Sequence, residues 1–386
     1  MKLKPRLKPY FNYKETLALI NPFNKLGAIE RLEKSFAAKF ENKFGTFFAH
    51  GRTGIFALLK SWNLNAVEII CPAYTCVVVQ HAIVLSGNIP VFVDASINDW
   101  NMDLGLLKKS IGPNTRVVIA THLFGYPMNV IELQEIIKEA ESQYGHKIYV
   151  IQDVAHSYGA KWEGQTVTRF GDAAIFGMNI SKILSSIFGG MVISNDPNLD
   201  KELKEWRNQN CKGNKWVKSI KRMAYYFAVR IAFNSWIYGI INMMERKGLL
   251  NAFVKYYEDN SISFPKDWNS PPTNTEASIG LVQLEKYDEI IKKRRAHALK
   301  WKDELSKKGT IEFMPDLPGN TYSHCVGLVE NRNEWIANFR QNSIQLGILI
   351  EYSVPEMKAF EQFKKQEFPN AKYFSEHSIN FPNWPR

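Results

Sequence analysis

The chain has 386 residues, of which 45% are hydrophobic and 23% charged, and it carries a formal net charge of +11. This length and composition are typical of a folded globular protein with one large and one smaller domain, and they exclude a largely disordered chain. The positive charge favours acidic partners such as nucleic acid, anionic lipid headgroups or phosphorylated substrates, although a generally basic surface would give the same value.

Two features bear on the cellular compartment. The cysteines have neither the spacing of a zinc site nor that of a redox pair, so we expect free thiols in a reducing cytoplasm and no metal; they are Cys71, Cys76, Cys211 and Cys325. Residues 1–15 contain no apolar stretch, so we expect no signal peptide there.

Short apolar runs alternate with helical patterns in the first half of the chain. The runs lie at 67–72, 89–94, 115–124 and 146–153, and the stretch 128–142 has a helical pattern. Continuous apolar runs are typical of parallel strands covered on both faces, so the alternation predicts an α/β fold with a mostly parallel sheet and helices on both sides. Ligands of such sheets bind beyond the carboxyl ends of the strands, and we therefore expect the chemistry in the loops that follow them.

Residues 51–53, Gly51, Arg52 and Thr53, immediately precede a predicted helix. Backbone N–H groups at a helix N-terminus bind phosphate, and the two side chains can add donors, although an ordinary helix start has the same pattern. Tyr74 follows the predicted strand at 67–72, where an aromatic ring can stack on a cofactor or simply pack in the core.

Two further residues have the chemistry of a cofactor site. Asp153 ends the predicted strand at 146–153, where a carboxylate can hold the protonated ring nitrogen of pyridoxal phosphate (PLP) or merely cap a turn. Lys182 lies among apolar and hydroxyl side chains, before the pair Gly189–Gly190. Desolvation there would lower the amine's pKa and favour its nucleophilic form, whereas an exposed lysine on a turn is the ordinary alternative. The glycine pair indicates a close backbone approach or a positive φ.

Residues 212–264 separate two regions that otherwise have the pattern of consecutive parts of an enzyme. The segment begins with basic residues and continues with an apolar run at 223–244, in which Arg230 is the one charged residue. Such a run approaches the roughly 20 residues that cross a bilayer, and its tyrosines and tryptophans suit the headgroup layer. A helix buried against the protein core or an interface is the alternative, and both interpretations stay open.

The last third of the chain predicts a smaller α+β domain. The predicted elements are a charged helix at 277–308, a strand at 321–329, a helix at 332–346 and a strand at 348–352. We therefore expect a large domain at 1–270, which includes the insertion at 212–264, and a small domain at 271–386.

The order of these signals along the chain is more specific than any one of them. The chain resembles the DegT/StrS-type sugar aminotransferases, a group of fold-type-I PLP enzymes. The resemblance covers nearly the whole chain apart from 212–264, and its strongest stretches are 91–103, 121–127, 151–165, 182–190 and 279–295.

The resemblance implies a role for individual residues. Lys182 would bind PLP covalently and then move protons, Asp153 would pair with the ring nitrogen, and His156 would lie beside the ring and its phenolic oxygen. The phosphate would bind at 51–53. Asn269 would reach the cofactor phosphate of a neighbouring subunit, which implies an obligatory homodimer with a shared active site.

Some positions depart from the family pattern. Cys76 stands where an aromatic residue often stacks on the cofactor. Gly177 replaces a phosphate-binding serine, for which Asn179 or Ser181 could compensate. Pro271 replaces a residue that is often arginine near the substrate.

The family also has a final helix after residues 379–386, so we expect this chain to be a shortened form.

The resemblance implies transfer of an amino group, with glutamate as donor, to a nucleotide-linked keto-sugar in the cytoplasm, for surface polysaccharide or amino-sugar biosynthesis. One alternative is an aminotransferase that contacts the inner face of the membrane through 212–264 and acts on a lipid-linked substrate. Another is a non-catalytic regulatory protein on the same scaffold, against which Lys182 and Asp153 argue. Related dehydratases replace the lysine, and no nucleic-acid-binding motif is present.

Overall fold

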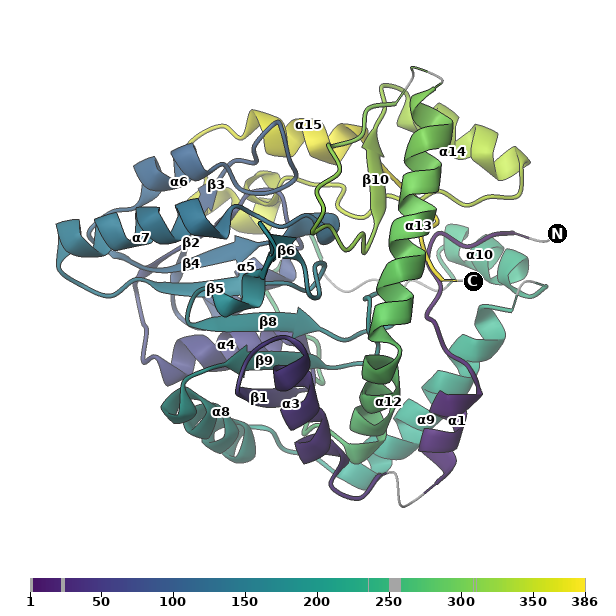
Figure 1. Cartoon of the computed structure of the whole chain (residues 1–386), viewed down its shortest axis with the longest axis horizontal. Helices are drawn as coiled ribbons and strands as arrows, with labels where there is room; N and C mark the ends of the chain where they lie inside the picture. Colours follow the sequence, from purple (N-terminus) through teal and green to yellow (C-terminus); the bar gives the residue numbers. More distant parts are fainter. Residues whose placement is uncertain are drawn as a thin grey trace.

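The structure, a computed structural model, describes residues 3–21, 25–234, 236–249, 258–307, 309 and 311–385. At its centre lies a seven-stranded sheet of order β1-β9-β8-β5-β4-β2-β3 (Figure 1). The strands are β1 (Phe44–Phe48), β2 (Glu68–Pro72), β3 (Ile89–Val93), β4 (Thr115–Thr121), β5 (Tyr149–Asp153), β8 (Ala173–Gly177) and β9 (Gly190–Ser194). Strands β2, β3, β4, β5 and β8 are parallel, and β9 and β1 are antiparallel to their neighbours. The predicted α/β fold with a mostly parallel sheet is confirmed.

Helices cover both faces because alternate residues of each strand point to opposite sides. Val117 and Ile119 of β4 face one core together with α4 (Gly51–Ser61), α5 (Val78–Leu85) and α8 (Pro197–Asn210). Val118 and Ala120 face the opposite core, which includes α6 (Leu104–Ser110) and α7 (Val130–Tyr144). On that second side, α3 (Ala28–Lys39) covers the β1, β8 and β9 end of the sheet. A short hairpin of β6 (Lys161–Trp162) and β7 (Gln165–Thr166) follows β5.

Side-chain caps fix where several helices begin. Asn129 caps α7 by accepting from the Glu132 N–H, and Asp196 caps α8. Thr273 forms a capping box with Glu276 at the start of α12 (Asn274–Glu285). These caps satisfy backbone donors that have no partner within the helix, so polar residues next to apolar runs set the boundaries.

The helix predicted at 277–308 is two helices, α12 and α13 (Tyr287–Ser306), that meet at Lys286. The Lys286 amine forms an ion pair with Glu15 and donates to the Tyr10 carbonyl, which ties this junction to the N-terminal segment. Helix α12 packs against α3 and α1 (Tyr13–Ile20). The division of the chain at residue 271 stays a prediction.

The C-terminal part contains β10 (Cys325–Leu328), antiparallel to β11 (Ser378–Phe381), together with α14 (Arg332–Gln341) and α15 (Pro369–His377). The prediction of a strand at 348–352 is wrong. The isolated bridge between Gly347 and Asn380 lies just before this segment, and the Ile350 carbonyl accepts from the Tyr74 hydroxyl instead of from a neighbouring strand.

The described residues of the insertion include two helices, α9 (Lys215–Ala232) and α10 (Tyr238–Arg246). The apolar run at 223–244 is therefore not one long helix. Helix α9 ends at Ala232, and the Asn234 carbonyl then accepts from the N–H groups of Ile237 and Tyr238, which are the first bonds of the path into α10. Among the described residues, no helix has both the length and the apolar character needed to cross a membrane.

The four cysteines have free thiols, as expected.

Candidate active site

Asp153 is the last residue of β5, at the carboxyl edge of the sheet, and it is almost completely buried. Its carboxylate accepts from the Ala155 N–H (3.1 Å) and from the hydroxyl of Thr121 (3.3 Å), the last residue of β4. Burial raises the pKa of Asp153, and the Ala155 N–H, the charge of Lys182 and the Thr121 hydroxyl offset part of this increase. A second cation beside this carboxylate would therefore stabilise its charged form.

Lys182 lies on the turn that follows β8. The Asn179 side chain shapes this turn by accepting from the Ser181 N–H (3.0 Å) and hydroxyl (2.6 Å), and the Asn179 carbonyl accepts from the Lys182 N–H. Burial lowers the pKa of the Lys182 amine, the charges of Cys76 and Asp153 raise it, and that of Arg52 lowers it further. The side chain is half-buried, and the direction of the pKa shift agrees with the partial desolvation expected for this lysine.

Glycines make room for this turn. A Cβ at Gly177 would lie 3.3 Å from Cε of Lys182, so the glycine leaves space beside the lysine side chain. Gly189 has a φ of +150°, and a Cβ at Gly190 would collide with the backbone of Gly51. The predicted close approach and positive φ at the glycine pair are both confirmed, and they bring the start of α4 against the lysine turn.

Helix α4 begins at Gly51 without a side-chain cap from His50. An uncapped N-terminus at this edge of the sheet is suited to an anion such as phosphate. The charge of Arg52 acts on the pKa of Lys182, so its guanidinium lies near the same site. The Thr53 hydroxyl, in contrast, donates to the Trp268 carbonyl at 2.6 Å and has a structural role in this state.

His156 completes the group around the lysine. Its ring stacks on Phe124, with 5.8 Å between centroids, and meets the ring of His324 edge-on at 5.0 Å. Burial lowers the pKa of both histidines well below the ordinary value, and the charge of Lys182 adds to this effect, so both rings are neutral. Nδ1 of His156 is buried and has no hydrogen-bond partner among the described residues.

Two predicted site residues lie elsewhere. Tyr74 packs in the core, with its hydroxyl 3.0 Å from that of Ser378 and its ring against Phe374, which corresponds to the packing alternative for this residue. Its loop instead brings Cys76 near Lys182. The Asn269 side chain donates to the Asn210 carbonyl at 3.3 Å, and no described contact joins it to the lysine of its own chain.

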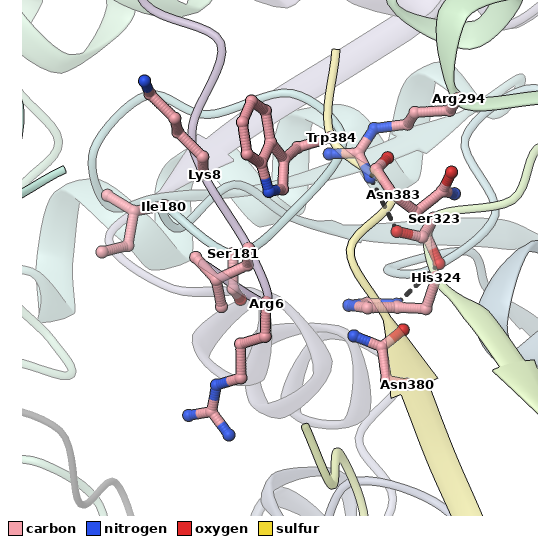
Figure 2. A pocket seen from close by; sticks show the side chains of 11 residues that line it. Arg6, Lys8, Ile180, Ser181, Arg294, Ser323, His324, Asn380, Asn383 and Trp384 are labelled. Atoms are coloured by element: carbon pink, nitrogen blue, oxygen red, sulfur yellow. Dashed lines mark hydrogen bonds between the residues drawn. The ribbon is translucent and has the colours of Figure 1, made fainter. Parts of the chain in front are cut away.

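A small cavity of about 10 Å³, enough for about one water molecule, lies beside the lysine turn (Figure 2). Figure 2 shows Arg6, Lys8 and Ser181 on one side and Arg294, Ser323 and His324 on the other. Nη1 of Arg294 donates to the carbonyls of Ser323 and Asn383, and burial lowers the pKa of this arginine to about 10. The cavity thus combines three cationic side chains with neutral polar groups.

Arg6, Arg294 and His324 were missed from the sequence. The first lies near the N-terminus, and the other two lie more than 100 residues beyond Lys182. His324 falls within a run that predicts a strand, and an isolated polar residue in such a run is the signal that could have drawn attention to it.

The residues of this site fit PLP. A desolvated amine, a buried carboxylate at a strand end and an uncapped helix N-terminus match the aldehyde, the ring nitrogen and the phosphate of this cofactor. The unpartnered Nδ1 of His156 is a buried polar atom that a ligand would satisfy. Lys182, Asp153, His156 and residues 51–52 would therefore hold the group.

A mostly parallel sheet with a half-buried lysine and a buried carboxylate at its carboxyl edge defines the class of PLP-dependent enzymes of fold type I. The chain belongs to the DegT/DnrJ/EryC1/StrS aminotransferase family, whose profile matches residues 21–386. It is a PLP-dependent aminotransferase.

Individual relatives agree with this assignment. The chain is 25% identical over 361 residues to GDP-perosamine synthase of Escherichia coli O157:H7. The aligned residues cover 92% of this chain and 85% of that protein. It is 24% identical over 205 residues to dTDP-4-amino-4,6-dideoxy-D-glucose transaminase of Shigella dysenteriae, covering 53% and 54% of the two chains. The crystal structure of S. venezuelae DesV shares the fold, with a TM-score of 0.76 and 19% identity over 100% of this chain and 94% of that one.

Proposed function

We propose that this enzyme transfers an amino group from glutamate to the keto group of a nucleotide-linked sugar, in the cytoplasm, for surface polysaccharide or amino-sugar biosynthesis. Relatives named for GDP-linked and dTDP-linked amino sugars support the substrate class. The observation that carries the proposal is the position of the half-buried Lys182 amine, near Asp153 and the neutral pair His156 and His324.

The arrangement supports distinct roles for the protein's own groups. PLP, when bound, supplies the electron sink that allows an amino group to leave one substrate and enter another. The lowered pKa of Lys182 keeps its amine available as a base that removes a proton from the substrate carbon and returns it. Asp153 keeps a cationic partner protonated, because a buried carboxylate is stabilised by the opposite charge.

Because His156 and His324 are neutral, they do not pair with the Asp153 carboxylate, which stays available to a cationic group of the cofactor. Because burial keeps His156 and His324 uncharged, they act as hydrogen-bonding groups and do not compete with Lys182 for protons. The Nδ1 atom of His156 is free to hydrogen-bond to an oxygen in the site.

The cations of the adjoining cavity support an acidic amino donor. Arg6, Lys8 and Arg294 line it, and arginine is suited to bidentate binding of carboxylates. Since Pro271 stands where the family often has an arginine, we propose that Arg6 or Arg294 binds a carboxylate of glutamate. Opening of the cavity is required, because its present volume admits about one water molecule.

We also propose a homodimer in which Asn269 reaches the phosphate site of the neighbouring subunit. Its support is that no described contact directs this side chain to Lys182 of its own chain, while it lies close to the partly exposed loop at 212–214.

The test is a pair of half-reactions followed by absorbance and mass spectrometry. Glutamate should convert the bound cofactor to its aminated form and release 2-oxoglutarate, and a GDP-, dTDP- or UDP-linked keto-sugar should then restore the cofactor and appear as an amino sugar. Lys182→Ala is the control. Amination of free sugars or keto acids, with no reaction on any nucleotide-linked acceptor, would contradict the proposal.

A further inference from the structure

Exposed apolar side chains are concentrated on one part of the molecule. Of the seventeen large hydrophobic side chains that are exposed among the described residues, thirteen lie in residues 13–26 and 216–249. These residues include α1, α9 and α10, which follow one another along one side of the protein (Figure 1). We call the exposed apolar side chains of these three helices and of the residues that flank them the apolar face.

Helix α9 buries two of its cations and exposes a stripe of apolar side chains. Its charged residues Lys218 and Arg222 point inward, where both form ion pairs with Glu276, at 3.1 and 2.8 Å. Arg222 also pairs with Asp267 at 2.8 Å. Beside its exposed cations the helix presents exposed apolar side chains with the spacing of one helical stripe, namely Trp216, Ile220, Phe227 and Ile231.

The other two helices contribute similar stripes. Tyr13, Leu17 and Ile20 of α1 are exposed, as are Ile240 and Met243 of α10. Helix α1 is held beside α9 by the hydroxyl groups of Thr16 and Tyr226, which lie 3.0 Å apart. An exposed apolar area of this extent on a water-soluble domain marks an interaction surface.

The same segment is strongly basic. Residues 212–249 contain eight lysines and arginines and one acidic residue, Glu245, so they contribute +7 of the net charge of +11. Six of the cations are exposed, namely Lys212, Lys215, Lys221, Arg230, Arg246 and Lys247. Glu245 itself is paired with Arg6 at 3.3 Å, so it does not offset these six.

We propose that the apolar face docks the enzyme on an anionic lipid bilayer, with α1, α9 and α10 lying in the headgroup layer. Exposed tryptophans near both ends of α9, Trp216 at 72% and Trp236 at 69% exposure, have the amphipathic character that this layer favours, and the exposed lysines and arginines complement anionic headgroups. This inference is independent of the sugar substrate proposed above.

Charge decides between a bilayer and other occupants. A two-fold contact between copies would place each basic segment against its own equivalent, which is electrostatically unfavourable. Nucleic acid would satisfy the cations but would leave the isoleucines and leucines of the face without an apolar partner. An anionic bilayer satisfies both, because its headgroups and acyl chains lie a few ångströms apart.

The apolar face is also connected to the active site. The Arg222–Asp267 pair continues to His50 at the start of α4, whose Nε2 lies 3.1 Å from Asp267. Glu245 of α10 holds Arg6, which lines the cavity beside Lys182. Docking would therefore fix the orientation of the site relative to the lipid surface.

Co-sedimentation of the PLP-loaded protein with vesicles tests the proposal. Vesicles with phosphatidylglycerol should bind the protein at least tenfold more strongly than vesicles of phosphatidylcholine alone, and added salt should weaken the binding. Lys215→Glu with Lys221→Glu should weaken it at least about 25-fold, since each cation near anionic lipid contributes about fivefold. Lys109→Glu with Lys138→Glu, on α6 and α7 at the far side of the sheet, is the matched control and should bind normally.

A second pair of variants tests the apolar contribution. Trp216→Ser with Trp236→Ser should lower binding about tenfold or more, because affinity follows the apolar area buried. Ile97→Ser with Leu299→Ser, which replaces exposed apolar residues elsewhere, should leave it unchanged. PLP content and circular dichroism confirm that each variant is folded.

The outcomes separate the possible partners. Failure of the folded protein to bind anionic vesicles overturns the proposal, and so does binding that the control pairs reduce as much as the face variants. If the tryptophan variant instead lowers the sedimentation mass, the face is a contact between copies and the lipid proposal is wrong. None of these results depends on the sugar substrate.

Discussion

Asp153 combines a cost in stability with a chemical role. Burial raises the pKa of its carboxyl group in the folded protein without cofactor, so above the ordinary carboxyl pKa the folded state binds more protons than the unfolded state. Stability therefore falls as pH rises from that value through the raised pKa. We predict that Asp153→Asn stabilises the cofactor-free protein at neutral pH, with a Tm higher on the order of 2 °C.

The same comparison at acid pH provides the control, because below the ordinary carboxyl pKa the two proteins should have the same Tm. A Tm for Asp153→Asn that is lower at every pH would show that its hydrogen bonds to Ala155 and Thr121 outweigh the desolvation of the charge.

In the PLP-bound enzyme, the same substitution should lower the reaction rate, although it raises the Tm of the cofactor-free protein. Asp153→Asn should slow the half-reaction with glutamate at least about 100-fold, which corresponds to about 2.7 kcal/mol, because the electron sink is weakened. Asp172→Asn, at the opposite edge of the same sheet, is the control and should react at nearly the normal rate. Nearly normal kinetics in Asp153→Asn would reduce Asp153 to a turn-capping residue.

Individual residues were predictable where one strand or turn determines their position. Asp153 and Lys182 follow strands recognisable from apolar runs, and parallel strands end at a common edge, so their convergence could be expected. The environment of Tyr74 could not, because its partners Ser378 and Phe374 lie about 300 residues away. Arg294 and His324 were missed for the same reason: only the tertiary fold brings them to the lysine.

At the scale of elements, helix α9 depends on two buried ion pairs. Glu276 is completely buried and binds both Lys218 and Arg222. Removal of its charge leaves the largely buried Lys218 without its acidic partner and Arg222 with Asp267 alone, which is more destabilising than the net contribution of the pairs. We predict that Glu276→Gln lowers the free energy of unfolding by about 3 kcal/mol.

Glu285→Gln, an exposed position on the same helix α12, should change that free energy by less than about 0.5 kcal/mol. Denaturant unfolding measures both variants. Equal effects would mean that α9 is held to α12 by apolar contacts and not by these charges.

Elements of the sheet could be predicted because buried parallel strands form unbroken apolar runs, and all four predicted strands are present. The insertion could not be read in the same way. Its apolar run continues past the end of α9 at Ala232 and into α10, so composition alone does not show where the first helix ends and the second begins. The inward orientation of Lys218 and Arg222 was also hidden, since Glu276 lies more than 50 residues away.

For the whole molecule, a shared active site predicts how much activity returns when two impaired variants are mixed. If Asn269 acts on the neighbouring subunit, a dimer of one Lys182→Ala chain and one Asn269→Ala chain has one intact site and one doubly impaired site. Random mixing of equal amounts should then give about a quarter of normal activity, since about half of the dimers are mixed. Each variant alone should be much less active than this.

Sedimentation of the separate variants is the accompanying control, because both must form dimers. No recovery of activity on mixing stable, exchanging dimers, or full activity in a monomer, would show that each chain builds its own site.

The net charge shows what the sequence could indicate for the molecule as a whole. A value of +11 predicted acidic partners but not their location, and the fold shows that most of the charge lies on the insertion, beside exposed apolar helices. The predicted domain boundary at residue 271 has no comparable support, because α12 packs against helices of the N-terminal region.

The assignment of chemistry to this fold depends most directly on Lys182. Purified protein should be treated with borohydride in the presence of PLP, digested and analysed by mass spectrometry, with Lys182→Ala as the control. We predict one pyridoxyl group per chain, attached to the peptide that contains Lys182, and none in the variant. Attachment to another lysine, or an equal yield in Lys182→Ala, would contradict the account.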